Sequence, residues 1–134
     1  MLIDDDKLTN FVNKMVIDEA GCAHHVVRKE SVQSGLEYLS NSALSHGVLQ
    51  FPDLIFLDMD MPVQDGWKFV DNYKKLKGNL PFSPVIIMLS SFNEPAYVAK
   101  ASNLPELSGF YNKPMSNQIL KEVIPLFFNS GDKS

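Results

Sequence analysis

The sequence predicts an α/β fold, a doubly wound sheet of five parallel strands with helices on both faces. Short apolar runs alternate with stretches whose apolar residues recur every three or four positions, which is typical of strands alternating with amphipathic helices. Two of the runs, 54–57 and 85–89, contain no polar residue, as expected for strands buried on both faces. Right-handed crossovers leave few other arrangements for such a chain.

The first strand is expected at residues 1–3, and it ends on Asp4, Asp5 and Asp6. Helix capping accounts for one or two aspartates, so three in a row beside a buried strand exceed that need. The following helix is expected to run to about Ala20, with Gly21 as its stop. Its apolar residues follow helical spacing and are Leu8, Phe11, Val12, Met15 and Val16.

A second strand is expected at 24–28, followed by a second helix whose N-cap is Ser31 and which Gly35 weakens slightly. The apolar side of this helix consists of Val32, Leu36, Leu39, Ala43 and Leu44. A third amphipathic helix follows Gly66, and its apolar residues are Trp67, Val70, Tyr73 and Leu76. We expect Trp67 to be part of the core rather than a platform for a ligand.

The second half of the chain repeats the strand and helix pattern. The remaining strands are expected at 85–89 and 108–111, and a short helix at 94–103. The apolar face of a last helix, with Pro125 as a candidate kink, consists of Ile119, Leu120, Val123, Ile124, Phe127 and Phe128. We therefore expect one domain at 1–128 and a polar, disordered tail at 129–134.

Composition and charge narrow the class of protein. The 134 residues suffice for one domain with a sizeable core, and the net charge is −4. Positive charge is clustered only at Lys74, Lys75 and Lys77, so direct nucleic-acid binding is not expected. No apolar run reaches the roughly 18 residues that cross a bilayer, and no secretion signal is evident, so we expect a cytoplasmic protein without membrane contact. The single Cys22 excludes an internal disulfide and is expected to be buried or half-buried.

Polar residues stand just past the carboxyl ends of the expected strands, where ligands bind in open parallel sheets. These residues are Asp4, Asp5, Asp6, Asp58, Asp60, Ser90 and Lys113. Several carboxylates at one edge raise each other's pKa unless a cation lies among them, and Mg²⁺ prefers such oxygen ligands. The set is arranged for phosphoryl transfer, with Asp58 as nucleophile, Ser90 as hydrogen-bond donor and Lys113 neutralising charge.

With these residues in place, the sequence resembles the receiver domain of two-component response regulators over nearly its whole length. The motifs are "LIDDD" at 2–6, "DLIFLDMDMPVQDG" at 53–66, "VIIMLSS" at 85–91 and "GFYNKP" at 109–114. Any one of them is weak alone, but four in the right order and spacing are strong. The resemblance implies a flavodoxin-like sheet with strand order 2-1-3-4-5 and a cis peptide bond between Lys113 and Pro114.

The resemblance also implies a role for each site residue. Asp58 is then the residue that accepts the phosphoryl group, which makes the chain a phosphoprotein. The Mg²⁺ ion is then held by Asp58, by Asp5 directly, by Asp4 mainly through water and by the backbone carbonyl of Asp60.

Three further residues match positions that respond to the phosphoryl group in this family. Ser90 matches the hydroxyl residue that moves towards it, Lys113 the lysine that pairs with it, and Phe110 the switch aromatic. The positions two beyond Asp58 and Ser90 help to admit the hydrolytic water, and the second of these is Phe92, whose ring is expected to shield the aspartyl phosphate.

The expected function is that of a phosphoacceptor in a two-component system, without turnover of an external substrate. Its partners would be a sensor histidine kinase or a histidine phosphotransfer protein, and a downstream protein. One alternative is a phosphatase of the haloacid-dehalogenase type that uses Asp58 and Asp60 as nucleophile and general acid, although that family places the pair on its first strand. Another is an inactive scaffold of the same fold, which need not carry Asp5, Asp58, Ser90 and Lys113.

Overall fold

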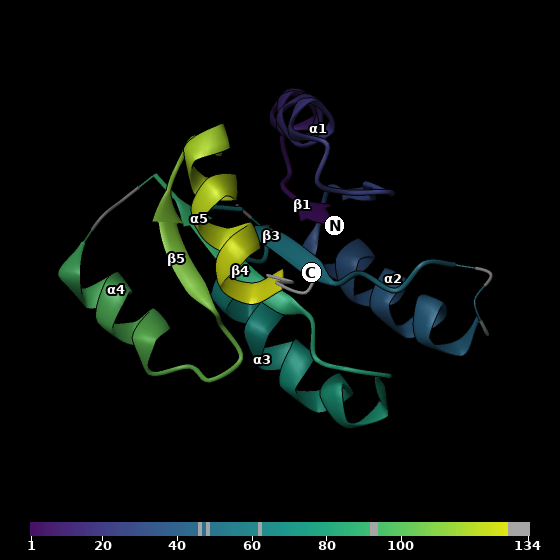
Figure 1. Ribbon diagram of the computed structural model, residues 1–134. Helices are drawn as coiled ribbons and strands as arrows, with labels where there is room; N and C mark the ends of the chain where they lie inside the picture. Colours follow the sequence, from purple (N-terminus) through teal and green to yellow (C-terminus); the bar gives the residue numbers. More distant parts are fainter. Residues whose placement is uncertain (46, 48, 62, 92–93, 129–134) are drawn as a thin grey trace.

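The computed structural model describes residues 1–45, 47, 49–61, 63–91 and 94–128. In these residues five parallel strands form one sheet in the order β2-β1-β3-β4-β5, so the predicted fold class and strand order are confirmed (Figure 1). The strands are β1 (Leu2–Ile3), β2 (Arg28–Lys29), β3 (Leu54–Asp58), β4 (Val85–Ser90) and β5 (Gly109–Asn112). The helices are α1 (Lys7–Ala20), α2 (Val32–Leu44), α3 (Gly66–Leu76), α4 (Pro95–Ser102) and α5 (Asn117–Phe128), with a 3₁₀ turn at Lys77–Asn79.

The sheet is covered on both faces because successive strand residues point to opposite sides. Ile55 and Leu57 of β3 belong to one core cluster, which includes residues of α2 and α3 such as Leu39 and Phe69. Phe56 of β3 belongs to the other cluster, which includes residues of α1 and α5. The uninterrupted apolar run of β3 is thus explained by burial on both faces.

Strand register brings the ends of β3, β4 and β5 to one edge of the sheet. Asp58 lies opposite Leu89 of β4, so Ser90 is one step beyond it. Ser90 in turn lies opposite Asn112, which places Lys113 just past the end of β5. The polar residues that follow the apolar runs therefore meet at the carboxyl edge, as the sequence indicates.

The predicted helix α1 is confirmed, but most of the apolar residues whose spacing predicts it face solvent rather than the core. The helix ends as expected, with Gly21 in a left-handed conformation at φ 67°. Four of its apolar residues are between 46% and 67% exposed: Leu8, Phe11, Val12 and Met15. Val16 is half-buried and packs against the second core cluster. The buried side carries Asn10, Asn13 and Ile17. Asn10 is turned inward because its amide is hydrogen-bonded to backbone carbonyls at the ends of β1 and β2.

Several smaller expectations need correction. Cys22 is exposed rather than buried. The second strand is shorter and later than expected, and Leu44 at the end of α2 faces solvent. Gly35 does more than weaken α2, because a Cβ there would lie 2.6 Å from Ile3 Cδ1, so the missing side chain lets α2 approach β1.

Other expectations are confirmed or lie outside the structure. Ser31 caps α2 through a capping box with Ser34, and the peptide bond between Lys113 and Pro114 is cis. The expected tail at 129–134 lies outside the described residues. Across the described part of the chain, no helix is both long and apolar enough to cross a membrane.

Gly66 brings α3 close to the end of β3. A Cβ at this position would lie 3.0 Å from the carbonyl oxygen of Asp58 and 3.0 Å from Met59 Cα. Backbone atoms cannot yield as a flexible side chain can, so a larger residue here must push the start of α3 away from the strand.

Replacing Gly66 with Ala is expected to lower the free energy of unfolding by about 1–3 kcal/mol, because the added methyl group meets backbone. Gly78→Ala is the matched control, since a Cβ there meets nothing within 4 Å. Its effect should stay within about 0.5 kcal/mol. Urea unfolding of both variants measures the difference, and equal effects would contradict the close approach of α3 to β3.

Candidate functional site

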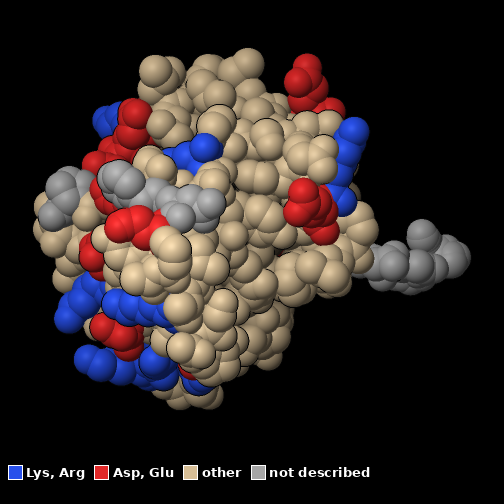
Figure 2. Space-filling model, turned by 90° about the vertical axis from the view of Figure 1, so that its left-hand side faces the viewer, with Lys and Arg blue, Asp and Glu red and all other residues tan. Residues whose placement is uncertain are grey.

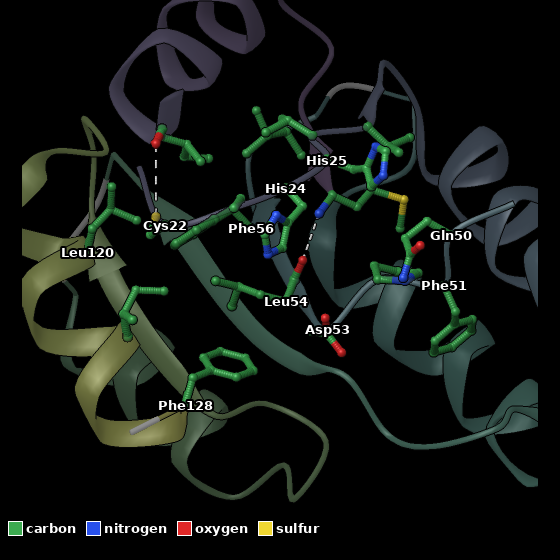
Figure 3. Close-up of a pocket in the computed structure, with 18 residues that line it drawn as sticks. Cys22, His24, His25, Gln50, Phe51, Asp53, Leu54, Phe56, Leu120 and Phe128 are labelled. Atoms are coloured by element: carbon green, nitrogen blue, oxygen red, sulfur yellow. Dashed lines mark hydrogen bonds between the residues drawn. The ribbon is translucent and has the colours of Figure 1, made fainter. Parts of the chain in front are cut away.

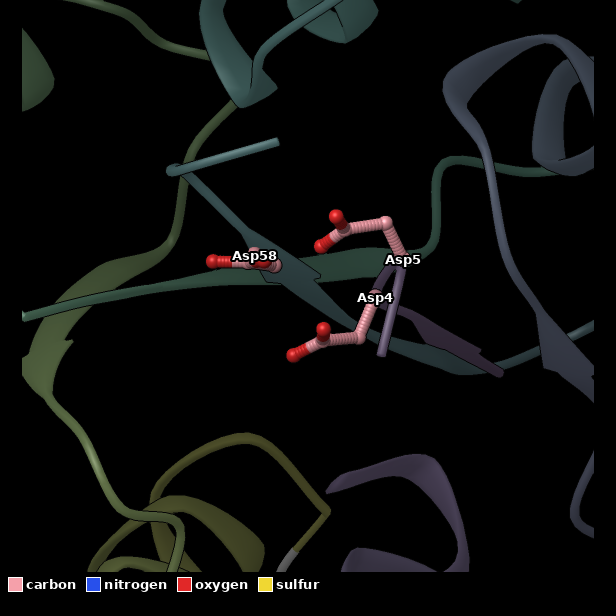
Figure 4. Close-up of side chains that lie close together, drawn as sticks. All are labelled: Asp4, Asp5 and Asp58. Carbon is pink, nitrogen blue, oxygen red and sulfur yellow. The ribbon is translucent and has the colours of Figure 1, made fainter. Parts of the chain in front are cut away.

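Three carboxylates from two strands converge at the carboxyl edge of the sheet. Asp4 and Asp5 follow β1, and Asp58 ends β3. One oxygen from each of the three lies within 4.8 Å of the others, and the side chains point into a shared space (Figure 4). Asp4 and Asp58 are buried, whereas Asp5 is exposed, so the cluster is open to solvent on one side.

Lys113 is directed into this cluster from the end of β5. Its Nζ lies 2.6 Å from Asp58 Oδ1 and 3.9 Å from an oxygen of both Asp4 and Asp60. Partial burial acts to lower the pKa of Lys113, but the hydrogen bond and the charge of Asp58, with those of Asp4 and Asp60, outweigh it and raise the pKa. The lysine is therefore charged, and one positive charge faces several carboxylates.

Backbone hydrogen bonds hold the lysine and the central aspartate in place. The main-chain N of Lys113 donates to the carbonyl oxygen of Ser90 at 2.8 Å. The main-chain N of Asp60 donates to Asp58 Oδ1 at 2.9 Å. Asp58 is only 3% exposed and Ser90 is fully buried at the end of β4. The geometry around Asp58 is thus set by the strands rather than by mobile side chains.

Asp4 has a raised pKa, and burial is the main cause. Burial, with added repulsion from Asp58 and Asp5, raises its pKa to about 6, although a hydrogen bond from the main-chain N of Asp6 and the charge of Lys113 act in the opposite direction. Three carboxylates thus lie together beside a single lysine.

The other predicted aspartates have distinct contacts. Asp6 caps α1, and its carboxylate accepts hydrogen bonds from the Thr9 hydroxyl and the Leu8 main-chain N, which lower its pKa. The carboxylate of Asp60 accepts a hydrogen bond from the main-chain N of Ser91 at 3.1 Å and so ties the loop after β3 to the end of β4. The use of the Asp60 backbone carbonyl as a metal ligand stays a prediction.

The described ring contact of Phe110 is with an aromatic side chain and not with the carboxylates. It is half-buried on β5, and its ring stacks on that of Trp67 at 6.5 Å between centroids. Trp67 also packs on Tyr97 at 6.4 Å and carries Lys100 Nζ 4.5 Å above its ring. These contacts link β5, α3 and α4, and Trp67 is half-buried as expected of a residue at the edge of the core. Phe92 lies outside the described residues.

Asn10 is a residue of the site that was not predicted from the sequence, and it donates hydrogen bonds to the carbonyl oxygens of Asp4 and Lys29. The spacing of Asn10, Asn13 and Ile17 along one side of α1 was visible in the sequence. Two amides on one side of a helix do not indicate a buried side, however, so this spacing alone does not predict the role of Asn10.

A cavity of the structure lies away from the carboxylate cluster. A hollow of about 580 Å³ lies at the opposite, amino-terminal edge of the sheet, beside Asp53 and Leu54 at the start of β3 (Figure 3). His24, His25 and the exposed Cys22 line it, but they form no group of three close metal ligands among the residues that the structure describes. Figure 2 shows a face on which charged side chains lie along the left margin and in a smaller group at the upper right, with a largely uncharged surface between them.

The carboxylate cluster fits a hard divalent cation. All of its donors are oxygens, one buried member has a raised pKa, and Lys113 supplies a single positive charge. Such a donor set suits Mg²⁺, which takes one or two carboxylates and completes its octahedron with waters, carbonyls or phosphate oxygens.

The sequence matches the family model of the response regulator receiver domain over residues 1–125. It is also similar to the two-component response regulators ARR10 and ARR12 of Arabidopsis thaliana, each 30% identical over 100 residues that make up 75% of this chain. The chain spans only 16% and 15% of the length of these two relatives.

Solved structures give the same picture. A two-component response regulator from Cytophaga hutchinsonii has a TM-score of 0.81 and 26% identity, covering 96% of this chain and 94% of that one. A response regulator receiver protein from Dyadobacter fermentans has a TM-score of 0.80 over 96% of both chains, and at 23% identity it supports the fold alone. The resemblance indicated by the four motifs is thereby confirmed.

The raised pKa of Asp4 predicts how stability depends on pH in the absence of metal. Its pKa is about 6 in the folded protein and about 3.9 in the unfolded chain, so between these values the folded state binds more protons. The free energy of unfolding should therefore rise, by about 1–3 kcal/mol, as the pH falls from about 7 to about 5.

Asp4→Asn removes this titration while keeping the shape of the side chain. Urea unfolding of both proteins in EDTA across this pH range isolates the Asp4 contribution, because all other groups are shared. A variant with the same pH dependence as the natural protein would contradict the raised pKa of Asp4 in the folded state.

Proposed function

We propose a function from one premise, that this chain belongs to the response regulator receiver domain family. Asp58 accepts a phosphoryl group from the phosphohistidine of a sensor histidine kinase or a histidine phosphotransfer protein. The observation that carries the proposal is the position of Asp58, which is buried against Lys113 and beside the carboxylates of Asp4 and Asp5. The chain spans a small part of its curated relatives, so any activity of a larger protein is part of the proposal.

Mg²⁺ is the proposed cofactor. Asp58 and Asp5 would contact it directly, Asp4 would act mainly through water, and Asp60 would contribute its backbone carbonyl. The support is geometric, because three carboxylates lie within reach of one ion beside a single lysine. A bound Mg²⁺ supplies positive charge to the oxygens of the transferring phosphoryl group.

The transfer step is a substitution at phosphorus. A carboxylate oxygen of Asp58 attacks, an O–P bond forms, and the P–N bond of phosphohistidine breaks with its electron pair left on the imidazole nitrogen. Asp58 Oδ1 is bonded to Lys113 and to the Asp60 main chain, so among the described contacts Oδ2 is the oxygen placed to attack. Lys113 and the Ser90 hydroxyl would then pair with the phosphoryl oxygens.

The phosphorylated site would hold about 1.5 to 2 additional negative charges, which the ammonium of Lys113 is placed to neutralise. That pairing competes with the contacts of Lys113 to Asp4 and Asp60. We propose that Phe110, stacked on Trp67, relays the change to α4, and that a downstream protein recognises the altered surface.

The chain acts as a phosphoacceptor and turns over no external substrate. Its phosphodonor proteins would place it in the cytoplasm, where ATP is available.

The alternatives are less well supported. A haloacid-dehalogenase-type phosphatase needs Asp60 as a general acid, yet its carboxylate already accepts a hydrogen bond from the Ser91 main chain and lies 3.9 Å from Lys113. An inactive scaffold has no need of a lysine 2.6 Å from a buried aspartate. The match to the receiver family also favours neither alternative.

The exposed apolar stripe of α1 (Leu8, Phe11, Val12 and Met15) is the proposed docking surface for the phosphodonor protein. The stripe begins three residues after Asp5, so it runs directly away from the carboxylate cluster. A donor that delivers its phosphohistidine to Asp58 must lie over this edge, and apolar side chains beside the site offer it a surface to bury.

Acetyl phosphate with Mg²⁺ should add the mass of one phosphoryl group to the protein, detected by intact mass spectrometry. Asp58→Asn should abolish the addition, because the nucleophilic carboxylate is lost. Asp53→Asn, which removes the exposed carboxylate just before the other end of β3, is the matched control and should be phosphorylated normally. A phosphate that persists in Asp58→Asn would refute the assignment of the phosphoacceptor.

The α1 stripe can be tested by comparing two kinds of donor. Phe11→Ser should slow transfer from a phosphorylated histidine phosphotransfer protein, chosen from a panel for its activity, by about tenfold, as expected when an apolar anchor is lost from an interface. The rate with acetyl phosphate should be unchanged, since this donor needs no protein surface.

Leu126→Ser is the control for Phe11→Ser because Leu126 is 68% exposed on α5. If the two variants slow transfer equally, or if Phe11→Ser also slows acetyl phosphate, α1 is not the docking surface.

A further inference from the structure

Asn10 is a polar residue on the buried side of α1, with 2% of its surface exposed. Its Nδ2 donates to the carbonyl oxygen of Asp4 at 3.0 Å and to that of Lys29 at 3.1 Å. The carbonyl oxygen of Lys29 also accepts the main-chain N of Asp4 at 3.0 Å. One side-chain amide therefore joins α1 to the ends of both β1 and β2.

The carbonyl group that Asn10 holds belongs to the peptide bond between Asp4 and Asp5. Because a peptide unit is planar, fixing its carbonyl oxygen also fixes the orientation of the atoms on either side. The directions in which the Asp4 and Asp5 side chains leave the main chain are thus set together. No other side chain in the described part of the structure is recorded as donating to this carbonyl.

Repulsion between carboxylates acts on the turn that follows β1. The carboxylates of Asp4, Asp5 and Asp58 lie within 4.8 Å of one another, and their repulsion acts to drive the turn away from β3. β1 has only two residues in the sheet, so it supplies few ladder hydrogen bonds to resist this movement. The amide of Asn10 adds two hydrogen bonds to the main chain beside this turn.

The acceptor side of the same amide is not used. Asn10 Oδ1 is buried and has no hydrogen-bond partner among the described residues. A residue that served packing alone would be more stable as an apolar side chain, which leaves no buried acceptor unpaired. The donor bonds to Asp4 and Lys29 are therefore the contribution of this residue.

We propose that Asn10 is a positioning residue for the metal site: it holds the peptide between Asp4 and Asp5 so that both carboxylates face Asp58 before a divalent cation binds. This inference rests on the proposed function, because it concerns the same Mg²⁺ site. A turn that is already ordered loses less freedom when the ion binds, so the affinity is higher.

The test is a Mg²⁺ titration of the natural protein, Asn10→Leu and Asn13→Leu. Leu is close to Asn in size but cannot donate hydrogen bonds. Asn13 is the matched control, since it is 6% exposed on the same side of α1 but lies one turn farther from Asp4. Binding is followed by fluorescence of Trp67, the single tryptophan, and by the rise in unfolding temperature that Mg²⁺ produces.

Asn10→Leu should weaken Mg²⁺ binding by about tenfold, the usual effect of losing a group that orients metal ligands, and Asn13→Leu by no more than about twofold. Unfolding temperatures measured in EDTA distinguish weaker Mg²⁺ binding from a loss of stability. If Asn10 had only a structural role, its loss would lower the unfolding temperature and leave the Mg²⁺ affinity of the folded protein unchanged. Should Asn10→Leu fail to fold, Asn10→Ser and Asn13→Ser are compared in the same way, and the same order is expected.

Equal Mg²⁺ affinities for the Asn10 and Asn13 variants would overturn the role of Asn10 while leaving the proposed function intact. A natural protein that shows neither a fluorescence change nor thermal stabilisation with Mg²⁺ would instead overturn the metal site, and with it both proposals.

Discussion

The ion pair between Lys113 and Asp58, at 2.6 Å, is the contact on which the rest of the site depends. A buried carboxylate at the end of a central strand is costly unless a positive charge lies beside it. Lys113 provides that charge from β5, but it must serve Asp4 and Asp60 as well. The site is therefore stable enough to fold and still short of positive charge, which is the condition for binding a cation and a phosphoryl group in turn.

The sheet makes this arrangement possible because it brings residues that are far apart in the sequence close together in space. Parallel register places Asp58 opposite Leu89 and Ser90 opposite Asn112, so groups from three strands meet at one edge. The main chain then supports the side chains, through the bond from Lys113 to the Ser90 carbonyl and the bond from Asp60 to Asp58 Oδ1. Preorganised charge of this kind is what phosphoryl transfer requires of a protein.

The sheet and the convergence of Asp58 with Lys113 could be predicted from the sequence because continuous apolar runs and residues at strand ends have a direct physical meaning. The orientation of α1 could not. Helical spacing shows that Phe11 and Met15 share a side, but only the need of backbone carbonyls for a donor turns Asn10 inward and leaves that side exposed. Likewise, the closeness of Gly66 to the end of β3 depends on packing between elements that local sequence does not describe.

The most direct measurement of the central claim is a crystal structure of the protein with Mg²⁺ and beryllofluoride, which mimics an aspartyl phosphate. We expect the fluoride complex on Asp58, the ion between Asp5 and Asp58, and Lys113 Nζ moved from the carboxylate to the fluorine atoms. A complex bound to another residue, or a Lys113 side chain directed away from Asp58 with no ion beside the carboxylates, would contradict it.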